Sequence, residues 1–416
     1  MLKSKIFFLI FSLSTEVSAA TYSISGNIEN KFINYTENSS NNLGYYHYFQ
    51  IEQKNKFGSY LSVVNQLRAK AESIEEDLAS KKSINKKAMF DGYLGENYIR
   101  YQAPKWVIQA GFQEIVWGES YGFNYADIIN PTDNRITFFS DKNQARIPIL
   151  LLNSKYFFQN SSIQLLMSPE AKYSKTLPID LFVGDLIPQN SIQVHPEKSQ
   201  SILKRNEYGL KLSMSSVGLD LSLAYFNYFN RNPYYTIKSA SLTNLELNEN
   251  HNRINSFILS LAKTLNDFIV RTDLVYTQNK IFNYFESQTL KNYQANSKEV
   301  LLSIDTPTVN KFTGFLVYAL KKQDQFKLNS FVPETENYII SKVTYNLENE
   351  KNFEVSYTRE LKLNGNSLQG QLNWPISNTT ELRAGSEFYF GDTGSNFSKI
   401  KKMNSLFIGI KNYFQL

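Results

Sequence analysis

The stretch Trp106-Val-Ile-Gln-Ala-Gly-Phe-Gln-Glu-Ile-Val-Trp-Gly-Glu-Ser-Tyr-Gly-Phe-Asn-Tyr-Ala-Asp-Ile-Ile-Asn-Pro-Thr-Asp133 changes character halfway along. Its first half alternates apolar and polar residues, which is the period-2 pattern of a β-strand. Its second half stops alternating and gathers glycine, asparagine, aspartate and proline among aromatic residues. Because most of the remaining chain reads as strand and turn, we interpret this stretch as the one non-repeating element of a closed β-structure.

The rest of the chain supplies the strands that such a structure needs. Residues 254–265 and 268–278, for example, alternate on both sides of the turn Asn266-Asp267. We count about 16 to 18 such strands, each near the 9–11 residues of a tilted transmembrane strand. We predict loops in the long polar stretches 69–87, 230–253 and 280–298, and either a large external loop or a second inward fold at 169–204. Short turns on one rim and long loops on the other are typical of an antiparallel outer-membrane β-barrel.

The composition also fits a membrane barrel. Aromatic residues make up 14% of the chain, although the mean hydropathy is only −0.37. In a transmembrane barrel alternate residues face lipid and lumen, so hydropathy stays low while aromatic residues collect at the interfaces. Cysteine is absent, which excludes disulfides and thiolate metal sites. The alternative, an exported β-sandwich, is disfavoured by the number of strands without linkers. We therefore predict an all-β, closed antiparallel transmembrane barrel with one inward-folded loop.

The N-terminus predicts export. Lys3 and Lys5 precede the apolar run 6–13, and small residues follow at positions 17–20. This is the layout of a secretory signal peptide, and the run is too short to cross a bilayer. We expect residues 1–20 to be a cleaved signal peptide and residues 21–416 to form a single barrel domain in the bacterial outer membrane. The formal charge of +6 is spread along the chain, which gives no support for nucleic-acid binding.

The last strand predicts contacts that a membrane barrel makes. One of its faces is apolar, with Leu406, Ile408, Ile410 and Phe414. This resembles the aromatic-ended final strand that the barrel-assembly machinery reads in outer-membrane proteins, although Gln415 and Leu416 follow it here. We therefore expect the partners to be outer-membrane lipid and the assembly machinery. The sequence leaves the oligomeric state open.

Motifs for catalysis or metal binding are missing from the sequence. The three histidines, His47, His195 and His251, have no carboxylate or second histidine at metal-ligand spacing. No nucleophile elbow, phosphate-binding loop or dinucleotide fingerprint occurs. We predict no enzyme activity and no cofactor, while a triad assembled from distant strands would leave no local motif.

The non-repeating half of the opening stretch holds the candidate site. Gly118 and Gly122 permit a sharp redirection of the chain. Asn124 is expected to cap a short helical turn over residues 125–129, which Asn130-Pro131 would end. Buried carboxylates need partners, so Glu119, Asp127 and Asp133 are expected to pair with Arg100, Arg135 or Arg146. The candidate constriction residues are Trp117, Gly118, Glu119, Ser120, Asp127, Asn130, Pro131 and Asp133.

This segment also carries a family resemblance. Trp117-Gly-Glu-Ser120, and then Asp127-Ile-Ile-Asn-Pro-Thr-Asp133, resemble a motif of a proteobacterial outer-membrane barrel family described only as a domain of unknown function. Phe112 stands where that family usually has arginine, so a contact made by that arginine is lost or moved. The resemblance covers about 30 residues closely, and it implies a porin-like barrel. Because members are often linked with inner-membrane transporters for hydrophobic compounds, it also implies such a transporter as a partner.

Two functions follow from these observations. The first is a porin-like channel that passes a small or hydrophobic solute across the outer membrane, with residues 118–134 folded inward to constrict the lumen. The alternative is a plugged barrel that serves as a surface binding or structural protein, with its long loops recognising a partner. The sequence does not name the solute, its direction of travel or a gating signal.

Overall fold

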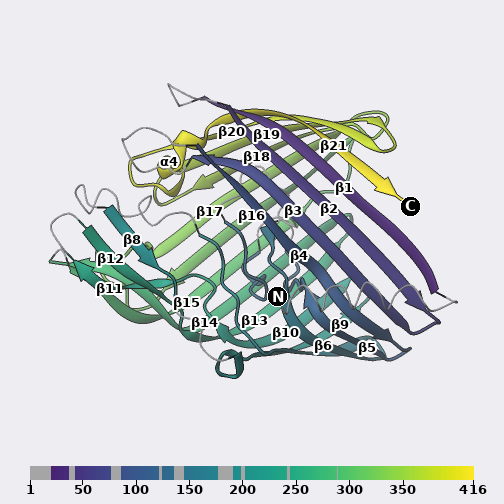
Figure 1. Ribbon diagram of the computed structural model, residues 1–416, viewed down its shortest axis with the longest axis horizontal. Helices are drawn as coiled ribbons and strands as arrows, with labels where there is room; N and C mark the ends of the chain where they lie inside the picture. The colour runs from purple at the N-terminus through teal and green to yellow at the C-terminus, as the bar shows by residue number, and fades with distance from the viewer. Residues whose placement is uncertain are drawn as a thin grey trace.

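A computed structural model describes residues 20–36, 43–75, 86–120, 124–134, 145–176, 191–197, 202–240, 244–287 and 289–416. In these residues 18 strands form a single antiparallel sheet that closes on itself. Closure is made by β1 (Ala20–Tyr35) and β21 (Ser405–Gln415), which lie side by side in Figure 1. The expected all-β barrel is therefore confirmed, and its strand number falls within the predicted range.

Every strand of the barrel pairs with the strands before and after it along the wall. Between β1 and β21 the wall contains β2 (Leu43–Phe57), β3 (Leu61–Glu75), β4 (Lys86–Gln102), β5 (Trp106–Gln113), β6 (Ile149–Phe158), β7 (Ser161–Ser168), β9 (Glu207–Ser216), β10 (Leu219–Phe229), β13 (Arg253–Leu265), β14 (Phe268–Glu286), β15 (Thr289–Asp305), β16 (Phe312–Gln323), β17 (Thr335–Asn346), β18 (Asn352–Glu360), β19 (Gly365–Ser377) and β20 (Thr380–Gly391).

The remaining elements lie outside the wall. A second sheet of three strands contains β8 (Ser191–His195), β12 (Asn244–Asn250) and β11 (Tyr234–Ala240), and it projects beyond the ends of β14 and β15 in Figure 1. The described residues also contain the short helical turns η1 (Ile202–Arg205), α4 (Asn396–Lys399) and η2 (Lys401–Met403). In the described residues no helix has the length and apolar character needed to cross a bilayer.

The alternation of side chains on β13 explains how the wall separates lipid from lumen. Ile254, Ser256 and Ile258 are buried, whereas Phe257 and Leu259 between and beyond them are exposed. Because successive residues of a strand point to opposite faces, one face of β13 is packed inside the barrel and the other is presented to the membrane. Small hydroxyl residues are tolerated on the inner face, whereas the same residues would be costly on the lipid face.

The two rims of the barrel differ as a membrane orientation requires. Ser25 lies opposite Gln415, so both ends of the described chain lie at the rim that carries the short turns. One of these turns joins β13 to β14, and Asn266 adopts a left-handed backbone with a φ of 53°. Short turns face the periplasm in outer-membrane barrels and long loops face outward. The long connections after β5, β7 and β10 all lie at the opposite rim, which is the rim that faces outward in outer-membrane barrels.

Three of the predicted polar loops need correction. Residues 280–298 are not a loop, because they continue β14 and β15 as a long hairpin; residues 69–75 extend β3; and residues 230–253 contain β11 and β12. Polar side chains pair across the extended hairpin, as Asn283 donates to Asn292 at 2.6 Å. Above the apolar band a strand needs no hydrophobic face, so alternation fails to predict it. The predicted loop 169–204 contains β8, while residues 177–190 and 198–201 lie outside the described residues.

Candidate functional site

The candidate segment, residues 118–134, follows the end of β5, where the chain leaves the wall. Asn130 fixes both ends of this excursion. The side-chain oxygen of Asn130 accepts a hydrogen bond from the backbone N–H of Ile115 at 2.7 Å. Its Nδ2 donates to the carbonyl oxygens of Gln113 and Ile147, at 3.0 Å each. A single buried amide thus joins the end of β5 to the chain that enters β6. These hydrogen bonds satisfy backbone groups at both ends of the segment. The strand pairing can therefore be interrupted here without leaving those groups buried and unbonded.

Gly118 is required at the point where the chain turns. Its φ is +93°, and a β-carbon there would lie 2.5 Å from Oδ1 of Asn124 and 2.8 Å from Cβ of Ala126. Asn124 donates to the carbonyl oxygen of Trp117 at 2.9 Å and accepts from the N–H of Ala126 at 2.8 Å. Asn124 therefore closes an Asx-type turn. The helical turn expected over residues 125–129 is wrong, because the structure has turn and bend there, with Ile128 donating back to Ala126.

Trp117 packs the start of the segment into the inner face of the wall. Only 1% of its surface is exposed, and its ring meets the edge of Phe226 on β10 at a centroid distance of 5.8 Å. Its indole N–H donates to Gln164 on β7 at 3.1 Å, as a buried tryptophan requires. The apolar cluster around it comprises Trp117, Ala126, Ile129, Ile149, Leu151, Leu166, Phe226, Tyr228, Ile254, Ile258 and Val275. Residues of the segment and of five strands thus share one core.

Asp273 on β14 anchors the middle of the segment. Its two carboxylate oxygens accept hydrogen bonds from the backbone N–H groups of Glu119 and Ser120, at 3.1 Å each. The Asp273 side chain is fully buried. Charge-assisted hydrogen bonds of this kind are about twice as strong as neutral ones. The segment is therefore attached to a strand that β6, β7, β9, β10 and β13 separate from β5 along the wall.

Tyr125 extends these contacts further around the barrel. It packs against the buried cluster of Leu301 on β15 with Val317 and Ala319 on β16, and also against the cluster around Trp117. These three residues belong to the inward-facing positions of their strands, because the residues between them are exposed. The contacts of the segment therefore run from β5 to the inner faces of β14, β15 and β16.

The predicted carboxylate partners are found in part. Asp127 accepts from Nη2 of Arg146 at 2.7 Å and from its Nε at 3.0 Å. Asp133 has lysine partners that the sequence did not single out: Lys70 on β3 donates to it at 2.8 Å, and Nζ of Lys175 lies 3.8 Å from its Oδ2. No ion pair joins Glu119 to Arg100 in the described residues, and Arg135 lies outside them. Burial raises the pKa of the Glu119 carboxyl, while the charge of Lys211 lowers it.

Glu114 and Arg68 form a buried ion pair beside the segment. The Arg68 guanidinium on β3 lies 2.5 Å from Oε1 of Glu114, and both side chains are mostly buried. Burial raises the pKa of Glu114 to about 7, although the neighbouring Arg68 acts in the opposite direction. Loss of water around the carboxylate therefore outweighs the attraction of the guanidinium. The charge of this pair changes near neutral pH.

Arg231 holds the far end of the segment and was not predicted from the sequence. Its guanidinium donates to both carboxylate oxygens of Glu207 at 2.8 Å, to the carbonyl oxygen of Lys172 at 2.9 Å and to that of Ile129 at 2.6 Å. One arginine thus ties the segment to β9 and to the connection that follows β7. Arginine suits this task because its donors lie in a rigid plane. Nothing local in the sequence marked Arg231, since its partners are far away in the chain.

The inner face of the barrel is charged at β1 and β20, on the side opposite β10. Glu29 on β1 lies 3.0 Å from Lys31 and 3.1 Å from Arg383 on β20, which also pairs with Glu381 at 2.6 Å. The apolar contacts of the segment lie on β6, β7, β10 and β13 to β16, whereas these ions lie on β1 and β20. Among the described residues no three histidine, aspartate or glutamate side chains are grouped to hold a metal ion.

Comparisons with known proteins agree with this architecture. The model of a family described as "Protein of unknown function (DUF1302)" matches residues 33–395. The crystal structure of Acinetobacter baumannii OccAB1 has a TM-score of 0.56 at 7% identity, over 96% of this chain and 97% of that chain. Pseudomonas aeruginosa OpdQ has a TM-score of 0.51 at 10% identity, over 96% and 99%. A search of curated proteins finds no match.

The structural likeness establishes the fold. The outer membrane protein opdK from Pseudomonas aeruginosa is similar over 95% of this chain and 99% of that chain, with a TM-score of 0.51 at 7% identity. The chain therefore has the fold of porin-like outer-membrane β-barrels. The family match also agrees with the resemblance inferred from the sequence, at the level of the family.

Proposed function

We propose that this chain, which belongs to the DUF1302 family of proteins of unknown function, is an outer-membrane channel for a small or hydrophobic solute. In this proposal residues 118–134 lie in the lumen and set its narrowest cross-section. Export through a cleaved signal peptide of residues 1–20 belongs to the same proposal, and the N-terminal mass of the mature protein would test it. No covalent chemistry and no cofactor are needed for such a channel.

The observation that carries the proposal is the pair of hydrogen bonds from Glu119 and Ser120 to Asp273, at 3.1 Å each. A segment that starts at β5 reaches β14 only by crossing the space enclosed by the wall. Packing of Trp117 and Tyr125 on inward-facing residues supports the same course. The charged side of the interior, around Arg383, then remains for the solute path.

The family resemblance supports the finer assignment of the solute. Because related barrels are linked with inner-membrane transporters for hydrophobic compounds, we propose such a transporter as a functional partner and a hydrophobic compound as the cargo. The mixture of aromatic and charged side chains in the interior is compatible with a solute that has both apolar and polar parts. Uptake or efflux of labelled hydrophobic compounds in cells with and without the gene would decide between this cargo and a small polar solute.

Single-channel recording in planar bilayers tests the channel proposal. Residues 118–129 are replaced by a short glycine-serine linker, so that Asn130, which joins the end of β5 to the chain that enters β6, is kept. The shortened protein should form channels with a higher conductance than the wild type, provided that heat-modifiable migration shows an assembled barrel. If the shortened barrel assembles and conducts as the wild type does, residues 118–129 do not constrict the lumen. If the wild type gives no conductance steps, the barrel is sealed.

A second candidate function rests on the three-stranded sheet above the rim. This sheet is held on the barrel by Asn283, whose side chain accepts from the N–H of Tyr235 at 2.8 Å and donates to its carbonyl at 2.7 Å. An ordered sheet outside the barrel favours a protein that binds a partner at the cell surface. Deletion of residues 234–250 separates the two functions, because a channel should keep its conductance and a surface binder should lose its partner.

A further inference from the structure

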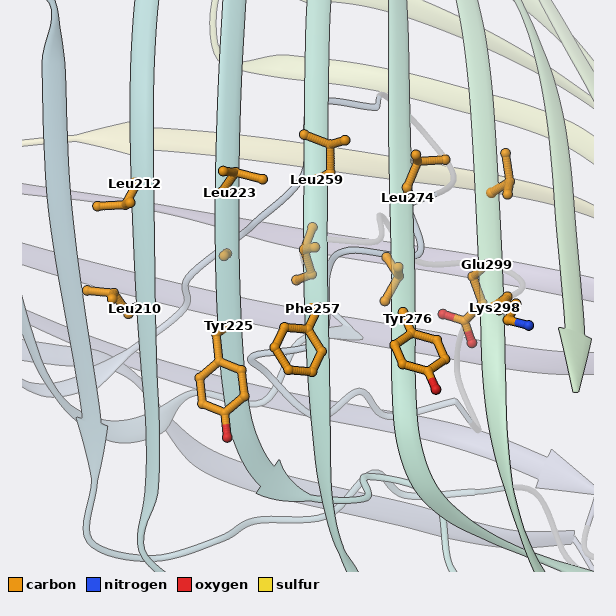
Figure 2. Close-up of a pocket in the computed structure, with 14 residues that line it drawn as sticks. Leu210, Leu212, Leu223, Tyr225, Phe257, Leu259, Leu274, Tyr276, Lys298 and Glu299 are labelled. Carbon is orange, nitrogen blue, oxygen red and sulfur yellow. The ribbon is translucent and has the colours of Figure 1, made fainter. Parts of the chain in front are cut away.

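The lipid-facing side of the barrel has an apolar groove across five neighbouring strands, β9, β10, β13, β14 and β15. The groove has a volume of about 650 Å³, which is the size of sites that hold small ligands. Its walls are the exposed leucines of β9, β10, β13 and β14, namely Leu210, Leu212, Leu223, Leu259 and Leu274. Figure 2 shows Leu212, Leu223, Leu259 and Leu274 in one row across these strands. This surface is suited to hydrocarbon chains.

An aromatic row closes one end of the groove. Tyr225 lies opposite Phe257, which lies opposite Tyr276, so the three rings form a row across β10, β13 and β14 (Figure 2). The Tyr225 and Phe257 rings are 5.1 Å apart. Aromatic residues of this kind mark the boundary between hydrocarbon and headgroups in outer-membrane barrels. On β10 and β13 the row lies toward the rim of the long loops, so the boundary is that of the outer leaflet.

Two lysines continue the aromatic row onto the next strands. Lys298 on β15 is the partner of Tyr276 in the strand register, and it lies directly opposite Lys322 on β16. Like charges placed opposite each other destabilise a pair of strands. Asp324 pairs with Lys298 at 3.2 Å, with both side chains substantially exposed. Lys322 is exposed and forms no ion pair in the described part of the chain, so one positive charge is left uncompensated.

The other charged groups near this surface do not offset the two lysines. Glu299 contributes to the groove lining, but its carboxylate accepts from Lys280 at 3.0 Å on the buried side of β15. Arg253 lies further toward the rim, where its guanidinium donates to Asn227 and to the carbonyl oxygen of Asn206. The groove therefore ends at a cationic site on the level of the headgroups, with hydrocarbon-sized space below it.

We propose that this surface binds a phosphorylated lipid of the outer leaflet. The acyl chains lie along Leu223, Leu259 and Leu274, and a phosphate group lies between Lys298 and Lys322. The phosphate supplies the negative charge that the lysine pair lacks, and the tyrosine hydroxyls of the aromatic row face the same polar layer. The site is on the outer face of the wall, so it is independent of whether the lumen conducts.

Native mass spectrometry of the full-length barrel in detergent tests the site. The probe is lipid A that carries two phosphates, compared with the same lipid after removal of both phosphates. Lys298→Gln/Lys322→Gln should lower retention of the phosphorylated lipid by on the order of tenfold, because two charge-assisted contacts are lost. Lys105→Gln/Lys263→Gln, which changes two exposed lysines at the short-turn rim, serves as the matched control and should bind as the wild type does.

Three further arms make the outcome decisive. The dephosphorylated lipid should bind to the wild type only as weakly as the phosphorylated lipid binds to the double lysine variant. Leu259→Trp should fill the groove and reduce retention without a change of charge, and inorganic phosphate at equal concentration should not compete. Equal retention by the double lysine variant, equal binding of the dephosphorylated lipid, or competition by inorganic phosphate would each overturn the proposal. So would a second copy of the chain that excludes the lipid from the groove.

Discussion

Replacement of Asp273 should release the segment from the wall while the barrel stays assembled. Asp273 receives two buried backbone hydrogen bonds, from Glu119 and Ser120. A hydrogen bond to a charged group contributes about 1.5–3 kcal/mol, so Asp273→Ala removes about 3–6 kcal/mol of attachment. In Asp273→Asn one oxygen is kept and an amide donor faces the second N–H, so about 1.5–3 kcal/mol is lost. The pairing of β14 with β13 and β15 uses backbone groups and is unaffected by either change.

Cysteine labelling at position 120 measures this release. The chain has no cysteine, so Ser120→Cys introduces a unique thiol at a residue that is 9% exposed, and the backbone N–H that Asp273 accepts is retained. Since 1.4 kcal/mol corresponds to a factor of ten, the maleimide reaction rate should rise on the order of tenfold with Asp273→Asn. With Asp273→Ala it should rise on the order of a hundredfold or more. The single-channel current of both variants should become larger or noisier.

Asp267→Asn is the matched control, because Asp267 is an exposed aspartate in the turn that precedes the same strand. It should leave labelling and conductance as in the wild type. The reasoning is refuted if Ser120→Cys reacts at the same slow rate in the Asp273→Ala background, with a heat-modifiable barrel. That outcome would mean that packing around Trp117 alone holds the segment in place.

Three further changes test the remaining contacts. Gly118→Ala should destabilise the segment by about 1–3 kcal/mol, since a positive φ is strained for other residues, and limited proteolysis should then cut it while the barrel resists. Arg231→Met should cost about 3–5 kcal/mol by leaving buried Glu207 unpaired, and Glu207→Gln in the same chain should recover part of the loss in thermal unfolding. Burial raises the pKa of Glu114 to about 7. Its protonation as pH falls through 7 should leave Arg68 uncompensated and increase anion selectivity in reversal potentials, a change that Glu114→Gln should lack. Because the pKa is raised in the folded protein, protonated Glu114 contributes stability below the usual carboxyl pKa, and this stability is lost as pH rises through 7. The free energy of unfolding of Glu114→Gln should therefore be higher than that of the wild type above pH 7.

The barrel could be predicted from the sequence because its signal is local and repeated. Within β13 the alternation of buried Ile258 with exposed Phe257 and Leu259 follows directly from the requirement that one face meets lipid. The prediction failed where that requirement ends. In the hairpin of β14 and β15, residues such as Asn283 and Asn292 lie above the apolar band and pair with each other, so polar sequence there gave the appearance of a loop.

The candidate segment could be located but its anchors could not. Gly118 and Asn130 are visible in the sequence, because a positive φ and a chain reversal require particular residues at that point. Nothing local in the sequence marks Asp273, because its role depends on a segment more than 150 residues away reaching the same place. The choice of Lys70 for Asp133 is of the same kind. A carboxylate needs a cation or donors, yet only the register of the closed wall decides which one faces it. Residues that a local conformation demands are therefore predictable, whereas residues selected by closure of the barrel are not.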